Sequence, residues 1–314
     1  MNVHQQRIPL GSIERYFAGH PVDDVVYAIS SLWVLDKPLD LNRLMESLCE
    51  LRRRFPVFFS TIDREHEDLA LVCDDALPVT HFLKIHSNLQ DNPREFFRRC
   101  LLQPLDIFSD TVFRLHYTPG PQPMLGFQTS HVVADGFTMD CFKRAFAETY
   151  AHPDPAPDSL QPQADWPGYR CAADRLRRSL KSRPSDLEWH AAREMKLSLP
   201  MPQALSAPPS HDVGIVHRQV TAAEFGAIFR RCLDLGVSTL HYLAACMAVA
   251  IDRTWDDWSR GAGDFFAINM PVDFRRQMGI RNQWGNVVYP LGMPYRKRDL
   301  EDIPTAARHT ARRF

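Results

Sequence analysis

Residues 127–137 read FQTSHVVADGF, and this stretch carries more information about the fold than any other in the chain. An apolar run typical of a strand ends at His131, and Asp135 and Gly136 follow a few residues later. A rigid sheet can hold an imidazole at such a place, and a histidine with an ordinary pKa near 6.5 suits general base catalysis. A hydrogen-bonded core histidine beside an ordinary turn explains the same residues.

The residues around His131 carry further expectations. If 124–132 is one strand, alternation places His131 on a face with Leu125 and Phe127, and Ser130 on the opposite face. Asp135 is expected to stabilise a tight turn and pair with a cation, while Gly136 accepts a positive φ. A metal site built on His131 and Asp135 lacks a third ligand at motif spacing, so no metal is predicted there.

Strand and helix patterns alternate on both sides of this stretch, which predicts an α/β chain. A proline-rich segment interrupts them and predicts a crossover, with helical patterns at 172–180 and 185–197. The expected regions are 1–155, a crossover over 156–210, and 211–314. Strands are predicted over 25–36, 55–62, 69–73, 79–85, 112–118, 124–132, 213–221, 264–270 and 285–292, and helices after Asp40 and over 92–103, 137–151, 222–235 and 238–254.

Composition excludes several classes of protein. With 314 residues, a net charge of -1 and 45% hydrophobic residues, the chain has the profile of a globular protein without a basic field for nucleic acid. Arginine clusters at 52–54 and 175–183 fall in helical patterns. Solvated helix faces account for them, and an anionic cofactor is the alternative reading.

The cysteines and the terminal sequence concern the cellular compartment. Seven scattered cysteines without C-x-x-C spacing argue against a disulfide framework or a zinc motif. The N-terminus lacks the apolar core of a signal peptide, and the run 240–251 is shorter than the about 20 residues that span a bilayer. These features predict a cytoplasmic protein without a transmembrane segment.

The sequence HVVADG at 131–136 resembles the H-x-x-x-D-G motif of the chloramphenicol acetyltransferase-like superfamily. This superfamily includes BAHD acyltransferases, alcohol acetyltransferases, polyketide-associated acyltransferases and the condensation domains of nonribosomal peptide synthetases. Three further segments are similar to the family, in the expected order. They are SIERYFAG at 12–19, LRRRFPVFFSTI at 51–62, and 270–292, where Val272-Asp273-Phe274-Arg275 precedes Gly285-Asn286.

The resemblance implies a chloramphenicol acetyltransferase-like fold of two α/β (α+β) subdomains, with mixed sheets flanked by helices. Two departures stand out. Many members carry two adjacent histidines, and here Ser130 takes the place of the first, whereas the catalytic second is retained as His131. The family's D-F-G-W-G element and last strands are absent from the sequence, so the second subdomain is expected to be incomplete and the chain a fragment or a short form.

The resemblance also implies a reaction. His131 would deprotonate a hydroxyl or amine acceptor, which attacks a thioester carbonyl without a covalent acyl-enzyme. Acyl-CoA is the expected co-substrate, and no bound cofactor is expected. A condensation-type enzyme that takes its acyl group from a carrier protein is the first alternative, and a non-catalytic remnant or binding protein is the second.

Other site residues follow from the same resemblance. Asp135 would be structural and would pair with Arg275, although Arg275 also fits a solvated basic cluster with Arg276 and Arg281. We expect Trp284, Gly285 and Asn286 to line the interface or the substrate site. The alternatives are that Trp284 is a packed core residue and that Asn286 is a turn residue. No residue is identified as the oxyanion stabiliser.

Overall fold

A computed structural model describes residues 5–19, 28–63, 69–87, 92–103, 105–152, 218–254, 265–279 and 284–313. The chain forms two compact units. The first unit contains Met1–Asp174, Val213–Ile215 and Arg275–Val287, and the second contains Arg175–Asp212, Val216–Phe274 and Val288–Phe314. The segment Arg275–Val287, which falls within the expected region 211–314, therefore packs with the first unit. The expected crossover over 156–210 lies outside the described residues.

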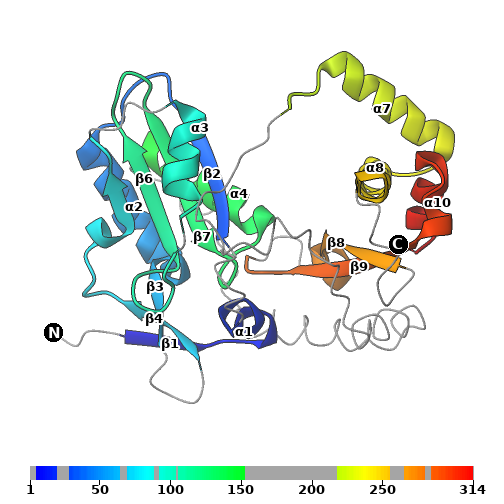
Figure 1. Cartoon of the computed structure of the whole chain (residues 1–314). Coiled ribbons are helices and arrows are strands. Elements are labelled where there is room, and N and C mark those ends of the chain that lie inside the picture. Colours follow the sequence, from blue (N-terminus) through cyan, green and yellow to red (C-terminus); the bar gives the residue numbers. More distant parts are fainter. Residues whose placement is uncertain are drawn as a thin grey trace. The chain divides into compact units, whose positions relative to one another are not determined.

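A mixed four-stranded sheet organises the first unit, in the order β2-β7-β6-β5 (Figure 1). Its strands are β2 (Ala28–Val34), β7 (Met124–Ser130), β6 (Phe113–Thr118) and β5 (Leu83–Ile85). β7 is antiparallel to both its neighbours, and β5 runs parallel to β6. Every residue of β6 and β7 is buried, so these two strands are covered on both faces.

A second, antiparallel sheet of the first unit has the order β1-β4-β3. Its strands are β1 (Gln5–Pro9), β4 (Ala70–Asp74) and β3 (Ser60–Asp63). The helical elements among the described residues of this unit are α1 (Ser12–Gly19), α2 (Leu41–Arg54), η1 (Pro56–Phe59), η2 (Val79–Phe82), α3 (Pro93–Phe96), the π-helical η3 (Phe97–Leu101), α4 (Gly136–Ala151) and α9 (Arg275–Met278).

Two of the predicted strands are correct only in their second halves. Residues 55–62 and 79–85 each begin with a 3₁₀ helix, η1 and η2, and become strands only at Ser60 and Leu83. Their high content of Phe and Val predicted strands throughout, but the tight turns bury Phe58, Phe59 and Phe82 in the core. Tertiary burial therefore overrides local strand preference.

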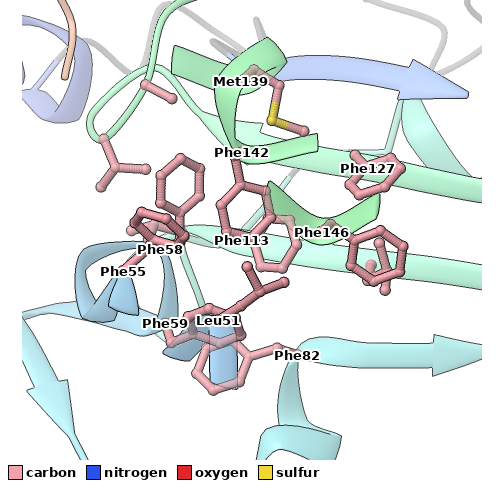
Figure 2. Close-up of a cluster of buried hydrophobic side chains, with 14 of the residues drawn as sticks. Leu51, Phe55, Phe58, Phe59, Phe82, Phe113, Phe127, Met139, Phe142 and Phe146 are labelled. Atoms are coloured by element: carbon pink, nitrogen blue, oxygen red, sulfur yellow. The ribbon is translucent and has the colours of Figure 1, made fainter. Parts of the chain in front are cut away.

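An aromatic core lies between the sheet and the helices α2 and α4. Phe142 of α4 stacks on Phe58 with ring centroids 4.2 Å apart, and it meets Phe113 of β6 edge-on at 5.0 Å. Figure 2 shows these rings among other buried side chains of the cluster. Because α4 begins directly after the His131 loop, this packing fixes the position of that loop relative to the sheet.

The opposite face of the same sheet is covered by α3 and η3. Gly126 of β7 lies so close to η3 that an added Cβ would come within 2.7 Å of Leu101 Cδ2. A smaller cluster of buried residues joins this helix to the sheet, consisting of Phe96, Cys100, Leu101 and Met124. The sheet thus separates two packed layers.

The described part of the second unit contains a two-stranded antiparallel sheet and three longer helices. β8 (Phe265–Asp273) pairs with β9 (Val288–Arg296). A hydrophobic core joins this sheet to α8 (Thr239–Thr254) and α10 (Ile303–Arg313), and it includes Phe266, Tyr295 and Ala307. α7 (Ala222–Leu235) begins with a Thr221–Glu224 capping box and ends at Gly236, whose φ is 66°. The short η6 (Lys297–Asp299) precedes α10.

Among the described helices, no single one is long and apolar enough to cross a membrane. α7 and α8 meet that condition of length and composition only when counted together, and the chain bends by 98° between them.

Candidate active site

The His131 loop begins where β7 ends at Ser130, two residues before the end of the expected strand 124–132. The amide of Ser130 still donates to Val112 O at 2.7 Å, but the amide of Val133 turns back to Ser130 O at 3.2 Å. The hydroxyl of Ser130 accepts from the amide of Val132 at 3.2 Å, so it is occupied within the turn. His131 is therefore the first residue of a turn, and strand alternation does not determine its direction.

Two contacts position His131. Its ring stacks on Phe17 of α1 with centroids 5.0 Å apart and planes at 20°. Its carbonyl oxygen accepts from Asn286 Nδ2 at 2.7 Å. Nδ1 of the ring is buried without a well-aligned hydrogen bond among the described residues, and a hydrogen bond to the backbone of Ala134 raises the pKa of the ring. The histidine is therefore held mainly by its backbone and its ring face.

The protonation state of His131 is set mainly by burial. Desolvation lowers the pKa of His131 below its usual 6.5, and the charge of Asp135 acts in the opposite direction without cancelling the shift. A lowered pKa keeps the imidazole neutral near pH 7. The neutral form is the one that can accept a proton.

Asp135 anchors the loop from the other side. It is the N-cap of α4, and its Oδ1 accepts from the amide of Thr138 at 2.9 Å. Arg275 donates to both carboxylate oxygens, from Nη1 at 2.8 Å and from Nη2 at 3.0 Å. The amide of Val287 adds a fourth donor at 2.9 Å. Asp135 is fully buried, so the charge is stabilised by a bidentate pair and two amides.

Arg275 and Thr138 extend this anchor into a network. Arg275 Nη2 also donates to Thr138 Oγ1 at 2.9 Å and to Gly285 O at 2.7 Å. The Thr138 hydroxyl lies 2.7 Å from Gly285 O and 3.0 Å from Gly285 N, so the two residues are linked through both backbone groups of the glycine. The network joins the start of α4 to residues more than a hundred positions later.

The solvated-cluster alternative for Arg275 is wrong, because its side chain is 3% exposed in this network. Arg276, its neighbour, is exposed, and Arg281 lies outside the described residues. The guanidinium of Arg275 also lies 4.5 Å from the centroid of the Phe137 ring. A cation desolvated to this extent needs such a set of partners.

The two glycines of the site have different roles from those expected. Gly136 is the first residue of α4 and is not among the described glycines with positive φ, so the expectation of a positive φ at Gly136 is wrong. A Cβ added there would meet nothing within 4 Å. Gly285, by contrast, has φ of 126°, a conformation that side chains rarely allow. The backbone conformation that requires glycine therefore occurs at Gly285 and not at Gly136.

Trp284 and Asn286 flank Gly285 in different surroundings. The indole of Trp284 stacks on Phe55 at 4.2 Å and belongs to the aromatic core. Asn286 is buried at the loop, and its Oδ1 has no hydrogen-bond partner among the described residues. Trp284 is therefore a packed tryptophan of the core, which is the alternative given for it above. A role of Trp284 or Asn286 in lining a substrate site stays a prediction.

Four residues that contribute to the site were not predicted from the sequence: Phe17, Phe137, Thr138 and Val287. Thr138 stands three residues after Asp135, the position whose amide an N-cap side chain normally binds, and this spacing is a usable signal. Phe17 lies within the segment SIERYFAG, but nothing in that segment indicates that its ring meets a histidine more than a hundred residues away.

Comparisons with known proteins are informative at the level of structure. No protein-family model matches the sequence, and no curated protein matches it. The X-domain from teicoplanin biosynthesis is similar with a TM-score of 0.69 and 18% identity, over 97% of this chain and 69% of the X-domain.

Two further solved structures are similar to nearly the whole chain. The first condensation domain of the calcium-dependent antibiotic synthetase has a TM-score of 0.66 and 16% identity, covering 98% of this chain and 73% of the domain. The epimerization domain from the third module of tyrocidine synthetase B has a TM-score of 0.68 and 12% identity, covering 99% and 71%. The chain therefore has the fold of condensation, epimerization and X-domains, the chloramphenicol acetyltransferase-like fold that its sequence motifs resemble.

Proposed function

We propose that the chain catalyses a condensation-type transfer, in which a carrier-protein thioester donates its acyl or peptidyl group to an amine or hydroxyl acceptor. The likeness to a condensation domain over 98% of the chain favours a carrier-bound donor over acyl-CoA, the donor expected first from the sequence. Both donors present the same thioester carbonyl, so the chemistry asked of the site is the same.

The reaction needs one group that accepts and returns a proton. Neutral His131 takes the proton from the acceptor N–H or O–H as the acceptor attacks the thioester carbonyl. The C–S bond of the resulting tetrahedral intermediate breaks, and the departing thiolate receives the proton from the imidazolium. Proton transfer of this kind contributes about 10²–10⁴-fold to a rate.

The observation that carries the proposal is the way in which His131 is held. Its ring face lies on Phe17 and its carbonyl is bound by Asn286. The side chain is only partly buried, and desolvation lowers its pKa below 6.5. A neutral imidazole that is fixed by its ring face and its backbone is suited to exchange a proton with a bound molecule.

Asp135 supports this base without acting as a proton relay. Both of its oxygens accept hydrogen bonds from Arg275, and the amides of Thr138 and Val287 donate to them as well. The carboxylate is thereby committed to holding the loop against the segment 284–287. Its charge only opposes the lowering of the pKa of His131.

A non-catalytic binding protein of the same fold is the competing possibility. The test is product formation with two donors, an acyl group on a carrier protein and the same acyl group on CoA, followed by mass spectrometry. We expect product from the carrier-bound donor and a lower rate with CoA. Absence of product from both donors across a panel of amines and alcohols would contradict catalysis.

The role of His131 is tested in the same assay with two variants. His131→Ala should lose about 10²–10⁴-fold in rate while remaining folded. His152→Ala is the matched control, because His152 is exposed at the far end of α4 and should leave the rate unchanged. Equal rates in the two variants would remove His131 from the mechanism.

A further inference from the structure

A second group of reactive side chains lies on the face of the four-stranded sheet that is covered by α3 and η3. His116 comes from β6, His86 follows β5 directly, and Cys100 comes from η3. Their ligand atoms, one nitrogen from each histidine and the sulfur of Cys100, all lie within 4.8 Å of one another. His116 and Cys100 are buried and His86 is partly exposed, so the group borders on solvent at one residue.

The two histidines are already arranged as neighbouring ligands. Nε2 of His86 lies 3.0 Å from Nδ1 of His116, and the two ring planes differ by 6°. Phe96 contacts His86 edge-on at 5.8 Å. A tetrahedral zinc ion with Zn–N near 2.0–2.1 Å separates two nitrogen ligands by about 3.3 Å. To bind an ion, the two nitrogens therefore have to separate by about 0.3 Å and the rings have to turn until both lone pairs point to the ion.

Gln128 fixes which nitrogen of His116 carries the proton. Its Nε2 donates to Leu101 O at 3.2 Å and to Gln103 O at 2.5 Å, which leaves Oε1 as the atom that faces His116. Oε1 lies 3.4 Å from Nε2 of His116 and accepts the proton of that nitrogen. The lone pair of His116 is thus on Nδ1, toward His86 and Cys100. Such an outer partner is typical of histidines that bind metals.

Two cationic side chains lie near His116, Lys84 and Arg114, and Arg114 is paired with Asp110. Because these nearby cations disfavour a dication, the thiolate of Cys100 has to supply the compensating charge.

We propose that His86, Cys100 and His116 form a binding site for a thiophilic divalent cation of the Zn²⁺ class. Two imidazoles and a thiolate are the donors that zinc prefers, and three protein ligands leave one position for a further donor. On binding, the thiol releases its proton to solvent and His86 binds through Nε2 as its Nδ1–H tautomer. The thiol needs to move by at most about 1.2 Å to reach a zinc–ligand geometry.

The proposal is tested on the full chain with Co²⁺ and Zn²⁺ alone. We expect one Co²⁺ per chain with a sulfur-to-cobalt charge-transfer absorption, displaced by one equivalent of Zn²⁺. Cys100→Ala should abolish that absorption. Cys73→Ala is the matched control, since Cys73 is a buried cysteine of β4 in the same unit and should leave the absorption intact.

A second variant guards against failure to fold. His86 is partly exposed, so His86→Ala is the least disruptive change, and circular dichroism verifies the fold. This variant should lower Zn²⁺ affinity by more than the about 10–100-fold that loss of an outer partner typically causes. No stoichiometric Co²⁺ binding by the wild-type chain, or equal binding by the Cys100 and Cys73 variants, would overturn the site and leave a two-histidine hydrogen bond.

Discussion

His131 and His116 lie beside the same four-stranded sheet, and the structure treats them in opposite ways. His116 is buried, with Nδ1 bound to His86 and Nε2 to Gln128. His131 is half-buried, with its ring face on Phe17 and without a well-aligned hydrogen bond at Nδ1 among the described residues. The comparison shows that two histidines beside one sheet can be held in different ways. Side-chain hydrogen bonds hold the ring of His116, whereas a stacked ring and the backbone hold His131.

The largest expected effect comes from removing Arg275, whose ion pair with Asp135 holds the His131 loop in place. Arg275→Met leaves the buried carboxylate of Asp135 without its cation, and loss of one partner of a buried pair costs about 3–5 kcal/mol of unfolding free energy. Urea denaturation measures the loss. Arg276→Ala is the control, because Arg276 is exposed beside it. A loss of similar size in both variants would show that the network does not stabilise the loop.

The paired change sharpens this result. Combining Arg275→Met with Asp135→Asn removes both charges, so the double variant should be less destabilised than the sum of the single variants. Co²⁺ binding at the His86–Cys100–His116 site should survive in the folded fraction, because its residues come from β6, η3 and the end of β5, whereas the network joins α4 to the segment 275–287. Additive losses would mean that the two side chains act independently.

The two glycines beside the network provide a smaller and more specific contrast. Gly285→Ala forces a side chain into φ of 126° and should cost about 1–3 kcal/mol. Gly136→Ala enters a helix where nothing lies within 4 Å of the new Cβ, and it should leave stability unchanged or raise it by about 0.4–1 kcal/mol. Thermal or urea unfolding of both variants tests the assignment, which a larger loss from Gly136→Ala would reverse.

The smallest expected effect concerns the aromatic contacts of the two histidines. Phe17→Leu removes the ring under His131, and an aromatic pair is worth about 0.5–1.5 kcal/mol, or roughly a 2- to 12-fold fall in kcat. Phe96→Leu removes the ring beside His86 and should leave kcat of the folded fraction unchanged. Kinetics should also show an altered pH profile for Phe17→Leu, since a merely structural role would not change it.

Much of the His131 site was predictable because its residues fall in short, ordered segments. The H-x-x-x-D-G stretch and the V-D-F-R and G-N elements resemble a known family in the expected order, and their resemblance implied the pairing of Asp135 with Arg275. Local patterns alone could not have paired residues 140 positions apart. Thr138 had a usable capping signal, whereas Phe17 reaches His131 only through tertiary packing.

The site at His86, Cys100 and His116 and parts of the fold could not be predicted from sequence patterns, and the reason is physical. His86, Cys100 and His116 come from three elements at wide spacing, so no metal motif marks them. The 3₁₀ helices η1 and η2 read as strands because Phe and Val favour strands, while burial of their rings decides the actual conformation. Both failures concern contacts that exist only after the sheet and its covering helices have assembled.

The pH dependence of kcat/KM for transfer from a carrier-protein thioester tests the central claim most directly. Burial lowers the pKa of His131, so the neutral base persists below pH 6.5 and is lost only as the pH falls through its lowered value. We predict an acidic limb with an apparent pKa below 6.5 that is absent from the residual activity of His131→Ala. The same acidic limb in wild type and His131→Ala would contradict the assignment of His131 as the base.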